Sequence, residues 1–408
     1  MSTSTLHREK KKTLVPQLRF PEFEQEWEEK KLGDIGKIKM CKRVFNHETL
    51  EKGDIPFYKI GTFGKVADAY ITKEHYDFFK EKFSFPKIGE ILLSAAGTLG
   101  RTVIYDGRPS YFQDSNIVWI ENNEKTTTNS FLYFVYQIVR YDSEGGTIQR
   151  LYNSIISNTK FNNPTLPEQQ KIASFLSAVD EKIQQLSRKK ELLEQYKKGV
   201  MQQLFSGKLR FKDENGEDYP DWEEKKLGDV AKFYKGKGVS KSDISVDGIN
   251  ECIRYGELYT RYGEVIQDVF SKTNFDINKA VVSQANDVII PASGETQIDI
   301  ATASCVMKSG VILGGDLNII RTCNNGIFLS YYLNNAKKLD IANLAQGISV
   351  VHLYSSQLAL LELNLPCILE QQKIANFLSS IDAKIESVNQ QIAQTQMFKK
   401  GLLQQMFV

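Results

Sequence analysis

One stretch of the chain, residues 168–205, returns without a gap as residues 370–407, with roughly half of its residues unchanged. Both copies open with Glu-Gln-Gln-Lys-Ile-Ala, and both reach a Lys-Lys-Gly segment near their ends. Neither copy contains proline, which interrupts helices because it lacks a backbone donor and clashes with the preceding turn. The repeat therefore divides the chain into two halves that each end in the same long element.

Apolar residues in both copies recur at alternating steps of four and three, which is the spacing of a coiled-coil seam. A helix of this length, about 55 Å at 1.5 Å per residue, cannot bury such a stripe alone. The pattern predicts that the two copies pack against each other, and two unrelated surface helices are the alternative. The expected seam consists of Ile172, Leu176, Val179, Ile183 and Leu186 in the first copy and Ile374, Leu378, Ile381, Ile385 and Val388 in the second.

A second repeated motif, Trp-Glu-Glu-Lys-Lys-Leu-Gly-Asp, opens each half at residues 27–34 and 222–229. Leu-Arg-Phe precedes the motif in both places. We interpret the tryptophan as the residue that anchors the start of a domain, with Lys-Leu-Gly-Asp leading into the first strand. Direct contact of the tryptophan with a ligand is the alternative.

Short strand-like runs, separated by glycine and charged residues, follow each opening motif. A helix-like piece at residues 129–141 interrupts the first series, and residues 230–362 repeat the order with different sequence. The pattern predicts an α+β fold, with two pseudo-symmetric mixed α/β domains separated by a long antiparallel two-helix coiled coil. We expect antiparallel helices because the second domain joins the end of the first helix to the start of the second, and about 150 residues fold to a radius of gyration of only about 15 Å.

The two repeats also predict where the segments of the chain begin and end. Each domain is long enough to form a hydrophobic core of its own. The expected segments are a basic tail at 1–16, a first domain at 17–165, a first long helix at 166–208, a second domain at 209–365 and a second long helix at 366–408.

Composition excludes some classes of protein and does not decide among others. Lys plus Arg number 52 against 50 for Asp plus Glu, so a DNA-binding surface would have to gather its positive charge locally. No apolar run is long enough to span a membrane, and the basic N-terminus lacks an apolar core, so we expect a cytoplasmic protein. The 5 cysteines are scattered, which argues against disulfides or a zinc site and favours buried thiols.

No catalytic motif appears with the spacing that its chemistry requires. The sequence contains no nucleotide-binding phosphate loop, no His-Glu-x-x-His metal motif and no Asn-Pro-Pro-Tyr-like tetrapeptide of amino-methyltransferases. The glycines of residues 236–238 resemble a phosphate cradle only loosely, and a flexible basic turn is the preferred interpretation. The histidines show no ligand spacing, so we expect a non-catalytic chain without a metal site.

Three features together resemble the specificity subunit of type I restriction-modification systems over nearly the whole chain: Leu-Pro-Glu-Gln-Gln-Lys-Ile-Ala-Ser-Phe-Leu at 166–176 with Leu-Glu-Gln-Gln-Lys-Ile-Ala-Asn-Phe-Leu at 369–378, the paired tryptophan motifs, and the four-part order. The resemblance implies two target recognition domains, each reading one half of a bipartite, asymmetric double-stranded DNA target. It also implies that the helices dock two methyltransferase subunits, through which restriction subunits join. S-adenosylmethionine, ATP and Mg²⁺ would act in those partners, with no cofactor in this chain.

The residues that we expect to contact DNA lie on two pairs of matching loops. Arg, Lys, Asn, Gln, Ser and Thr read base edges, and further basic residues hold phosphates. Taken singly, an ordinary solvated side chain is the alternative for each. The first loop pair carries Lys59, Thr62 and Lys65 against Arg254, Tyr259 and Arg261, and the second carries Thr98 and Arg101 against Thr296 and Gln297.

Lys197 and Lys399 fall in the apolar register near the ends of the repeated helices, and Gly199 and Gly401 follow them. A glycine inside a helix costs up to about 1 kcal/mol relative to alanine. Either the lysine stems cover the seam while their charges reach water, or this last third of each helix leaves the seam and meets another chain.

A non-catalytic DNA-recognition subunit is the leading functional hypothesis from the sequence. Its main rival is a coiled-coil scaffold whose end domains bind proteins, and a cryptic enzyme is a distant third. DNA affinity that falls steeply with salt separates the first two, because a protein-binding scaffold need not bind DNA.

Overall fold

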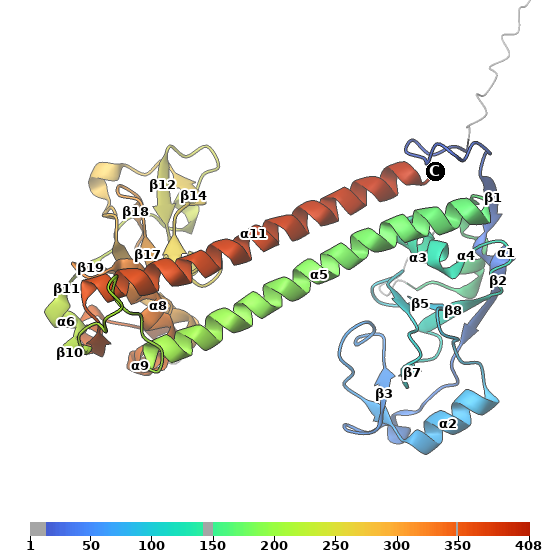
Figure 1. Ribbon diagram of the computed structural model, residues 1–408, viewed down its shortest axis with the longest axis horizontal. Coiled ribbons are helices and arrows are strands. Elements are labelled where there is room, and N and C mark those ends of the chain that lie inside the picture. Colours follow the sequence, from blue (N-terminus) through green and yellow to red (C-terminus); the bar gives the residue numbers. More distant parts are fainter. Residues whose placement is uncertain (1–13, 142–149, 348–349) are drawn as a thin grey trace, which may run out of the picture. The chain divides into compact units, whose positions relative to one another are not determined.

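The computed structural model describes the chain except for residues 1–13, 142–149 and 348–349 (Figure 1). Most of the predicted basic tail therefore lies outside the described residues. Across the part of the chain that is described, no helix has the length and apolar character needed to cross a membrane.

The chain divides into two compact units. Unit 1 comprises residues 1–186 and 391–408, and unit 2 comprises residues 187–390. The two longest helices, α5 (Leu166–Phe205) and α11 (Ile368–Met406), each contribute residues to both units. Each unit is therefore a mixed α/β domain that includes one end of each long helix.

Unit 1 combines a four-stranded sheet, a three-stranded sheet and a two-stranded pair with short helices. Its strands and helices are β1 (Glu28–Lys31), α1 (Leu32–Ile35), β2 (Gly36–Met40), β3 (Ile55–Tyr58), β4 (Tyr70–Ile71), α2 (Lys73–Lys82), β5 (Ile91–Ser94), β6 (Thr102–Ile104), β7 (Tyr111–Phe112), β8 (Ile117–Asn122), α3 (Asn129–Ile138), α4 (Asn153–Asn158) and β9 (Lys160–Asn163). One sheet has the order β2-β8-β5-β6, the other has the order β4-β3-β7, and β1 pairs with β9. The last pairing ties the opening motif to the residues just before α5.

The core of unit 1 is closed by α3 and by the ends of the two long helices. Thr128 caps α3 by accepting a hydrogen bond from the Phe131 backbone N–H, and Phe131 is fully buried. The same apolar cluster contains Trp27, Leu176 of α5 and Leu402 of α11. The N-terminal part of α5 therefore packs beside the C-terminal part of α11.

Unit 2 repeats this plan with more strands. Its elements are β10 (Glu223–Lys226), α6 (Leu227–Val230), β11 (Ala231–Lys235), β12 (Asn250–Ile253), η3 (Tyr255–Glu257), β13 (Val265–Ile266), β14 (Ser271–Thr273), β15 (Asp287–Pro291), β16 (Ser293–Gly294), α7 (Gln297–Ile300), β17 (Ser304–Val306), β18 (Ile312–Leu313), β19 (Leu317–Thr322), α8 (Gly326–Asn335), α9 (Lys338–Leu344), β20 (Val351–His352), α10 (Ser355–Leu358) and β21 (Glu362–Leu365). The main sheet has the order β11-β19-β15-β17-β13, and β10 pairs with β21 as β1 does with β9. Val200 of α5 and Ile374 of α11 share its core, so here the end of α5 meets the start of α11.

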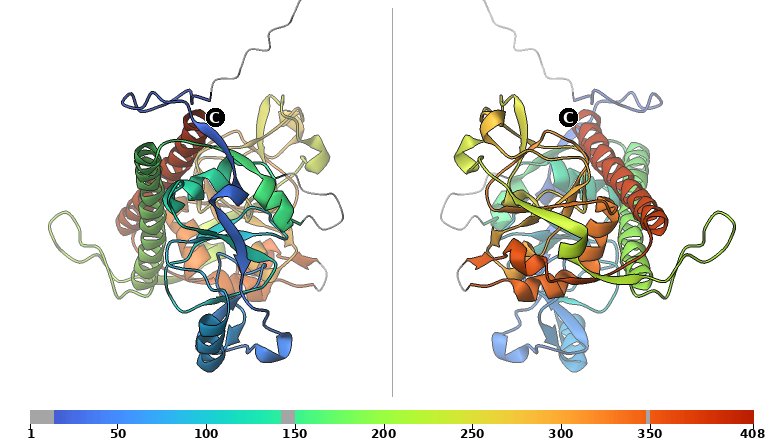
Figure 2. Two further views of the ribbon diagram at one scale, coloured as in Figure 1. Left: turned by 90° about the vertical axis from the view of Figure 1, so that its right-hand side faces the viewer. Right: turned by 90° about the vertical axis from the view of Figure 1, so that its left-hand side faces the viewer.

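The contacts inside each unit thus make α5 and α11 antiparallel neighbours, and the helices lie side by side in both sets of views (Figure 1 and Figure 2). None of the predicted seam residues is exposed. Val179, Ile183 and Ile385 are partly buried, and the fully buried ones are Ile172, Leu176, Leu186, Ile374, Leu378, Ile381 and Val388.

A buried glutamate in the first turn of each long helix holds the opening motif of its unit. Glu168, 1 % exposed, accepts hydrogen bonds from Arg19 Nε at 2.8 Å, Arg19 Nη2 at 2.9 Å and Trp27 Nε1 at 3.3 Å. The tryptophan therefore anchors the start of the domain. The equivalent three residues in unit 2 are Glu370, Arg210 and Trp222.

Lys197 and Lys399 do not extend their charges into water, which was the first of the two arrangements predicted for them, and contact of this last third of each helix with another chain stays a prediction. Lys197 Nζ lies 2.7 Å from Asp382 Oδ1 and 5.0 Å from the centre of the Tyr331 ring, and only 13 % of its side chain is exposed. Lys399 repeats this arrangement with Asp180 at 2.7 Å and the Phe134 ring. The ammonium groups stay inside each unit because an aspartate of the other long helix pairs with them.

Two further expectations are corrected. The Leu-Gly-Asp of each opening motif forms a one-turn helix, α1 or α6, because the aspartate side chain accepts a hydrogen bond from the backbone N–H three residues earlier, and the first strand precedes it. Cys323 is exposed rather than buried. Cys41 and Cys305 are buried, and burial raises the pKa of each thiol to about 12.

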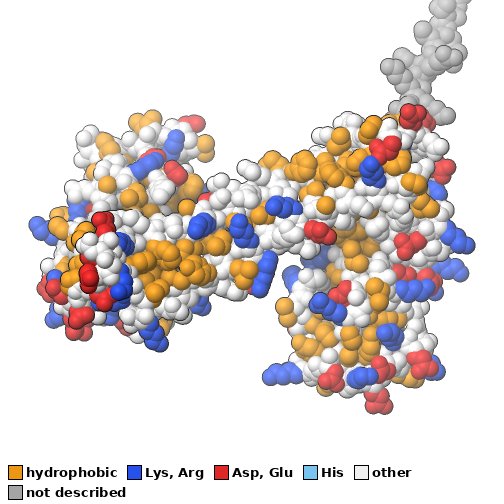
Figure 3. Space-filling view, viewed as in Figure 1, with side chains coloured by type: hydrophobic (Ala, Val, Ile, Leu, Met, Phe, Trp, Pro, Cys, Tyr) orange, Lys and Arg blue, Asp and Glu red, His pale blue; other side chains and the backbone are white. Residues whose placement is uncertain are grey.

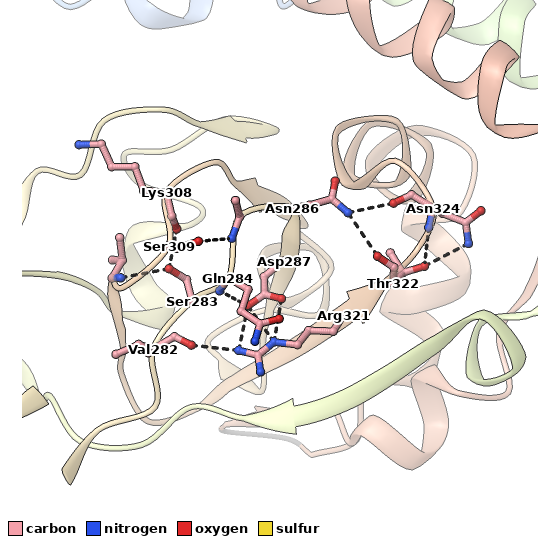
Figure 4. Close-up of polar contacts among 12 residues, drawn as sticks. Val282, Ser283, Gln284, Asn286, Asp287, Lys308, Ser309, Arg321, Thr322 and Asn324 are labelled. Atoms are coloured by element: carbon pink, nitrogen blue, oxygen red, sulfur yellow. Dashed lines mark hydrogen bonds and ion pairs between the residues drawn. The ribbon is translucent and has the colours of Figure 1, made fainter. Parts of the chain in front are cut away.

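A polar cluster pins the main sheet of unit 2 to α8 (Figure 4). Asp287 of β15 accepts hydrogen bonds from the Arg321 guanidinium of β19 at 3.0–3.2 Å, and Arg321 also donates to the Val282 carbonyl. Asn286 adopts φ 81° and its Oδ1 accepts from the Gly326 backbone N–H at 2.7 Å. A Cβ at Gly326 would lie 2.4 Å from the Asn286 carbonyl oxygen, so this junction requires glycine.

Candidate nucleic-acid interface

In unit 2 the loop after β12 forms one wall of a cavity of about 650 Å³. The cavity wall includes the predicted residues Arg254, Tyr259 and Arg261. Burial raises the pKa of the Tyr259 hydroxyl, and the nearby Tyr255, Glu295 and Asp299 add to the shift. Tyr259 therefore stays a neutral donor near neutral pH.

The centre of this wall is Glu257, a residue that the sequence analysis did not select. Its side chain is 4 % exposed, and Oε2 accepts a hydrogen bond from the Arg254 backbone N–H at 2.9 Å. Oε1 lies 3.4 Å from Arg254 Nη2 and 3.8 Å from Arg261 Nη1. The sequence does carry a signal for Glu257, because Arg254 lies three residues before it and Arg261 lies four residues after it.

Another part of the cavity lining comes from the glycine segment after β11. Gly238 adopts φ 111°, and Ser240 and Lys241 follow it on the cavity wall. A flexible basic turn is the interpretation that the sequence favours for this segment. Lys241 and Ser240 add a positive charge and a hydroxyl group to the lining of the cavity that also contains the two arginines.

The second predicted loop of unit 2 borders the cavity through Glu295 rather than through the residues selected. Thr296 caps α7, since its Oγ1 accepts from the Asp299 backbone N–H at 3.1 Å. Gln297 Nε2 lies 3.5 Å from the Ala345 carbonyl. Within the described part of unit 2, the cavity-lining set contains neither Thr296 nor Gln297. Both remain exposed.

In unit 1 the two predicted loops lie against each other. Arg101 Nη1 donates to the Phe63 carbonyl at 2.9 Å, which joins the second loop to the first. Gly97 adopts φ 67°, and a Cβ there would lie 3.7 Å from Ile60. The loop tip is closed by Thr98, whose carbonyl accepts from Ser94 Oγ at 2.5 Å. The two loops predicted for unit 1 are therefore neighbours in space.

The remaining predicted residues of unit 1 differ in their availability. Lys59 Nζ forms an ion pair with Asp68 at 2.9 Å, and both side chains are about half exposed. Thr62 turns inward, where its Oγ1 accepts from the Lys59 backbone N–H. Lys65 is exposed and lines a second cavity of about 440 Å³, whose wall also carries Tyr58. Of the predicted cations in unit 1, Lys65 has the most open surroundings.

The face drawn in Figure 3 carries basic and acidic side chains interspersed on both units. On this face, positive charge is not gathered into one broad area. Among the residues that the structure describes, no group of three or more His, Cys, Asp or Glu side chains is placed to hold a metal ion. The predicted loops of each unit form what we call its loop cluster: residues 59–65 with 97–101 in unit 1, and residues 254–261 with 294–297 in unit 2. The loop clusters therefore differ from the rest of the surface by a local cavity and by the basic side chains near it.

The chain is similar in sequence to proteins that are named specificity subunits of type I restriction enzymes. A Haemophilus influenzae putative type I restriction enzyme specificity subunit, S.HindORF215P, is 56% identical over 146 residues, which cover 36% of this chain and 38% of that protein. A putative type I restriction enzyme MjaX specificity subunit from Methanocaldococcus jannaschii is 25% identical over 410 residues, covering 94% of this chain and 93% of the relative.

Solved structures show the same fold. The structure of a type I restriction-modification S subunit from M. genitalium covers 97% of this chain and 99% of its own with a TM-score of 0.59 at 15% identity. A chain from a study of assembly and conformational transition of the type I R-M system gives a TM-score of 0.52 at 16% identity over 93% of this chain and 96% of its own. The family model for the type I restriction modification DNA specificity domain matches residues 24–195 and 219–396 of this chain. Because those two matches account for most of the chain, the protein belongs to the type I restriction-modification DNA specificity family.

Proposed function

We propose that each unit reads one half of a bipartite, asymmetric double-stranded DNA target. One observation carries this proposal. The two units share one plan and have their loop clusters in equivalent places, but the side chains on the two clusters differ. Unit 2 presents Arg254, Arg261 and Lys241 around its cavity, whereas unit 1 presents Lys65 and Arg101. Different donors in the groove select different base edges, so two such units favour two different half-sites.

In this proposal the chain is not itself catalytic and works in the cytoplasm with partner subunits. Two methyltransferase subunits would dock on it, and restriction subunits would join through them. S-adenosylmethionine would act in the former, and ATP with Mg²⁺ in the latter. Tyr196 and Phe398 support two equivalent docking places, because they occupy matching positions of the repeat and are 52% and 54% exposed.

The first prediction tests recognition itself. Co-expression of the full chain with the modification subunit of its system should produce methylation at a two-part DNA motif, detected by sequencing of modified bases. The control is the same modification subunit without this chain, which should leave that motif unmodified. If methylation is identical with and without the chain, the DNA-recognition function is wrong.

Salt dependence separates this function from that of a coiled-coil scaffold whose end domains bind proteins. Neutralised phosphates release counterions, so the DNA affinity of the assembled complex should fall steeply as salt rises. Complexes that assemble but show no DNA affinity at low salt would favour the scaffold.

The second prediction concerns the independence of the two units. Replacing residues 230–360 by the matching segment of a relative should change one half of the methylated motif completely and leave the other half unchanged. The reason is that the exchanged segment contains the loop cluster of unit 2 and ends before α11. The matched control exchanges residues 35–160 instead. A change in both halves after either exchange would contradict modular reading.

A further inference from the structure

We infer that Glu257 is a positioning residue for base discrimination by unit 2, because its buried carboxylate fixes the two arginines of the cavity wall. This inference rests on the proposed function, since it assumes that Arg254 and Arg261 face DNA. It goes beyond that function by assigning the discrimination to a residue that does not itself need to touch a base.

The carboxylate of Glu257 is held from several directions. Ser271 Oγ of β14 donates to Oε1, and the Arg254 backbone N–H donates to Oε2 at 2.9 Å. The Arg261 and Tyr262 backbone N–H groups donate to the Glu257 carbonyl at 2.9 and 3.1 Å. Because these bonds come from backbone N–H groups and from Ser271, they hold the position of the negative charge without the arginine side chains.

Arg261 has a second support besides this acid, and Arg254 is partly buried. The Arg261 guanidinium lies 5.5 Å from the centre of the Phe270 ring, which stacks on Tyr262 at 5.5 Å. Arg254 Nε is buried and makes no hydrogen bond among the described residues, and the Arg254 side chain passes over Gly314, where a Cβ would lie 3.6 Å from its Cγ. Both arginines therefore contact Glu257 and line the cavity.

Fixing an arginine matters because reading a base edge depends on direction. A guanidinium that reads guanine must present two donors in a set plane, whereas a phosphate accepts a cation from many directions. A free arginine side chain also loses rotamer entropy when it binds. Without the Glu257 charge, both arginines would gain freedom and net positive charge, which favours phosphates over bases.

The test uses the full chain assembled with its modification subunits. Glu257→Gln keeps the shape of the side chain and removes its charge. We expect the ratio of affinities for the cognate site and for a site altered in the unit 2 half to fall roughly 10- to 100-fold. Affinity for random DNA should stay equal or increase, and its salt dependence should steepen. The matched control is Glu251→Gln, which removes a carboxylate of the same unit that pairs with Lys308, and it should change neither quantity.

Two outcomes overturn the inference: an unchanged ratio in Glu257→Gln, or an equal loss of cognate and random binding, which marks a merely structural role. If Glu257→Gln fails to fold, Arg261→Met decides. Its side chain is 55% exposed, so removing it should leave the unit folded and still reduce discrimination in the unit 2 half alone; intact discrimination there would overturn the inference. A wild-type complex that discriminates no site at all would instead refute the proposed function.

Discussion

Replacement of Asp287 by alanine is expected to lower the free energy of unfolding of unit 2 by roughly 3–5 kcal/mol. The Asp287 side chain is 2% exposed and accepts both from Arg321 and from the Gln284 backbone N–H at 2.8 Å. The substitution leaves the Arg321 guanidinium, stacked 4.6 Å over the Tyr234 ring, without its counter-charge in a largely buried place. Denaturant unfolding of the full chain, with hydrogen exchange to locate the loss in β15 and β19, measures the effect.

Two comparisons show whether the loss comes from the unpaired charge. The double variant Asp287→Leu with Arg321→Met removes both charges and should recover most of the stability, because apolar replacements of buried ion pairs are often neutral or better. Glu251→Ala breaks an ion pair with Lys308 whose side chains are about 40% exposed, and it should cost less than about 1 kcal/mol. A loss below about 1 kcal/mol for Asp287→Ala would contradict the argument.

Glu168→Ala is expected to cost a similar amount, roughly 3–5 kcal/mol, in unit 1. It leaves Arg19, whose side chain is 11% exposed, and the Trp27 indole N–H without their shared acceptor. It also removes a negative charge from the first turn of α5, where it interacts favourably with the helix dipole. Because the same residues hold the opening motif, hydrogen exchange should rise in β1 and β9 as well as in the first turns of α5.

The repeat supplies a matched pair for this experiment. Glu370→Ala removes the equivalent acid in unit 2, but Arg210 is 25% exposed, so water can partly solvate it and the loss should be smaller. Glu181→Ala, on the exposed face of α5, should change stability by no more than about 0.5 kcal/mol. If Glu181→Ala and Glu168→Ala cost the same, the buried acceptor is not what holds the domain to the helix.

In the candidate interface, the sequence predicted residues that belong to a repeated local pattern and missed residues whose role depends on tertiary contacts. Arg254, Tyr259 and Arg261 could be selected because their loop matches another loop in the repeat. Thr296 was selected on the second matched loop in the same way, and its hydroxyl caps α7. Glu257 was not selected, although Arg254 and Arg261 stand on either side of it in the sequence, because its burial depends on contacts such as the hydrogen bond from Ser271, fourteen residues later.

The sequence by itself determined the order of domains and long helices, the register of the seam and the equivalence of the two opening motifs. These properties repeat along the chain, and periodicity is visible without coordinates. Only the tertiary structure decided which charges meet: Lys197 with Asp382, 185 residues apart, and Asp287 with Arg321. The physical reason is that a buried charge is stable only when an opposite charge pairs with it. Which residue forms that pair depends on how distant segments of the chain pack, and not on the neighbouring residues in the sequence.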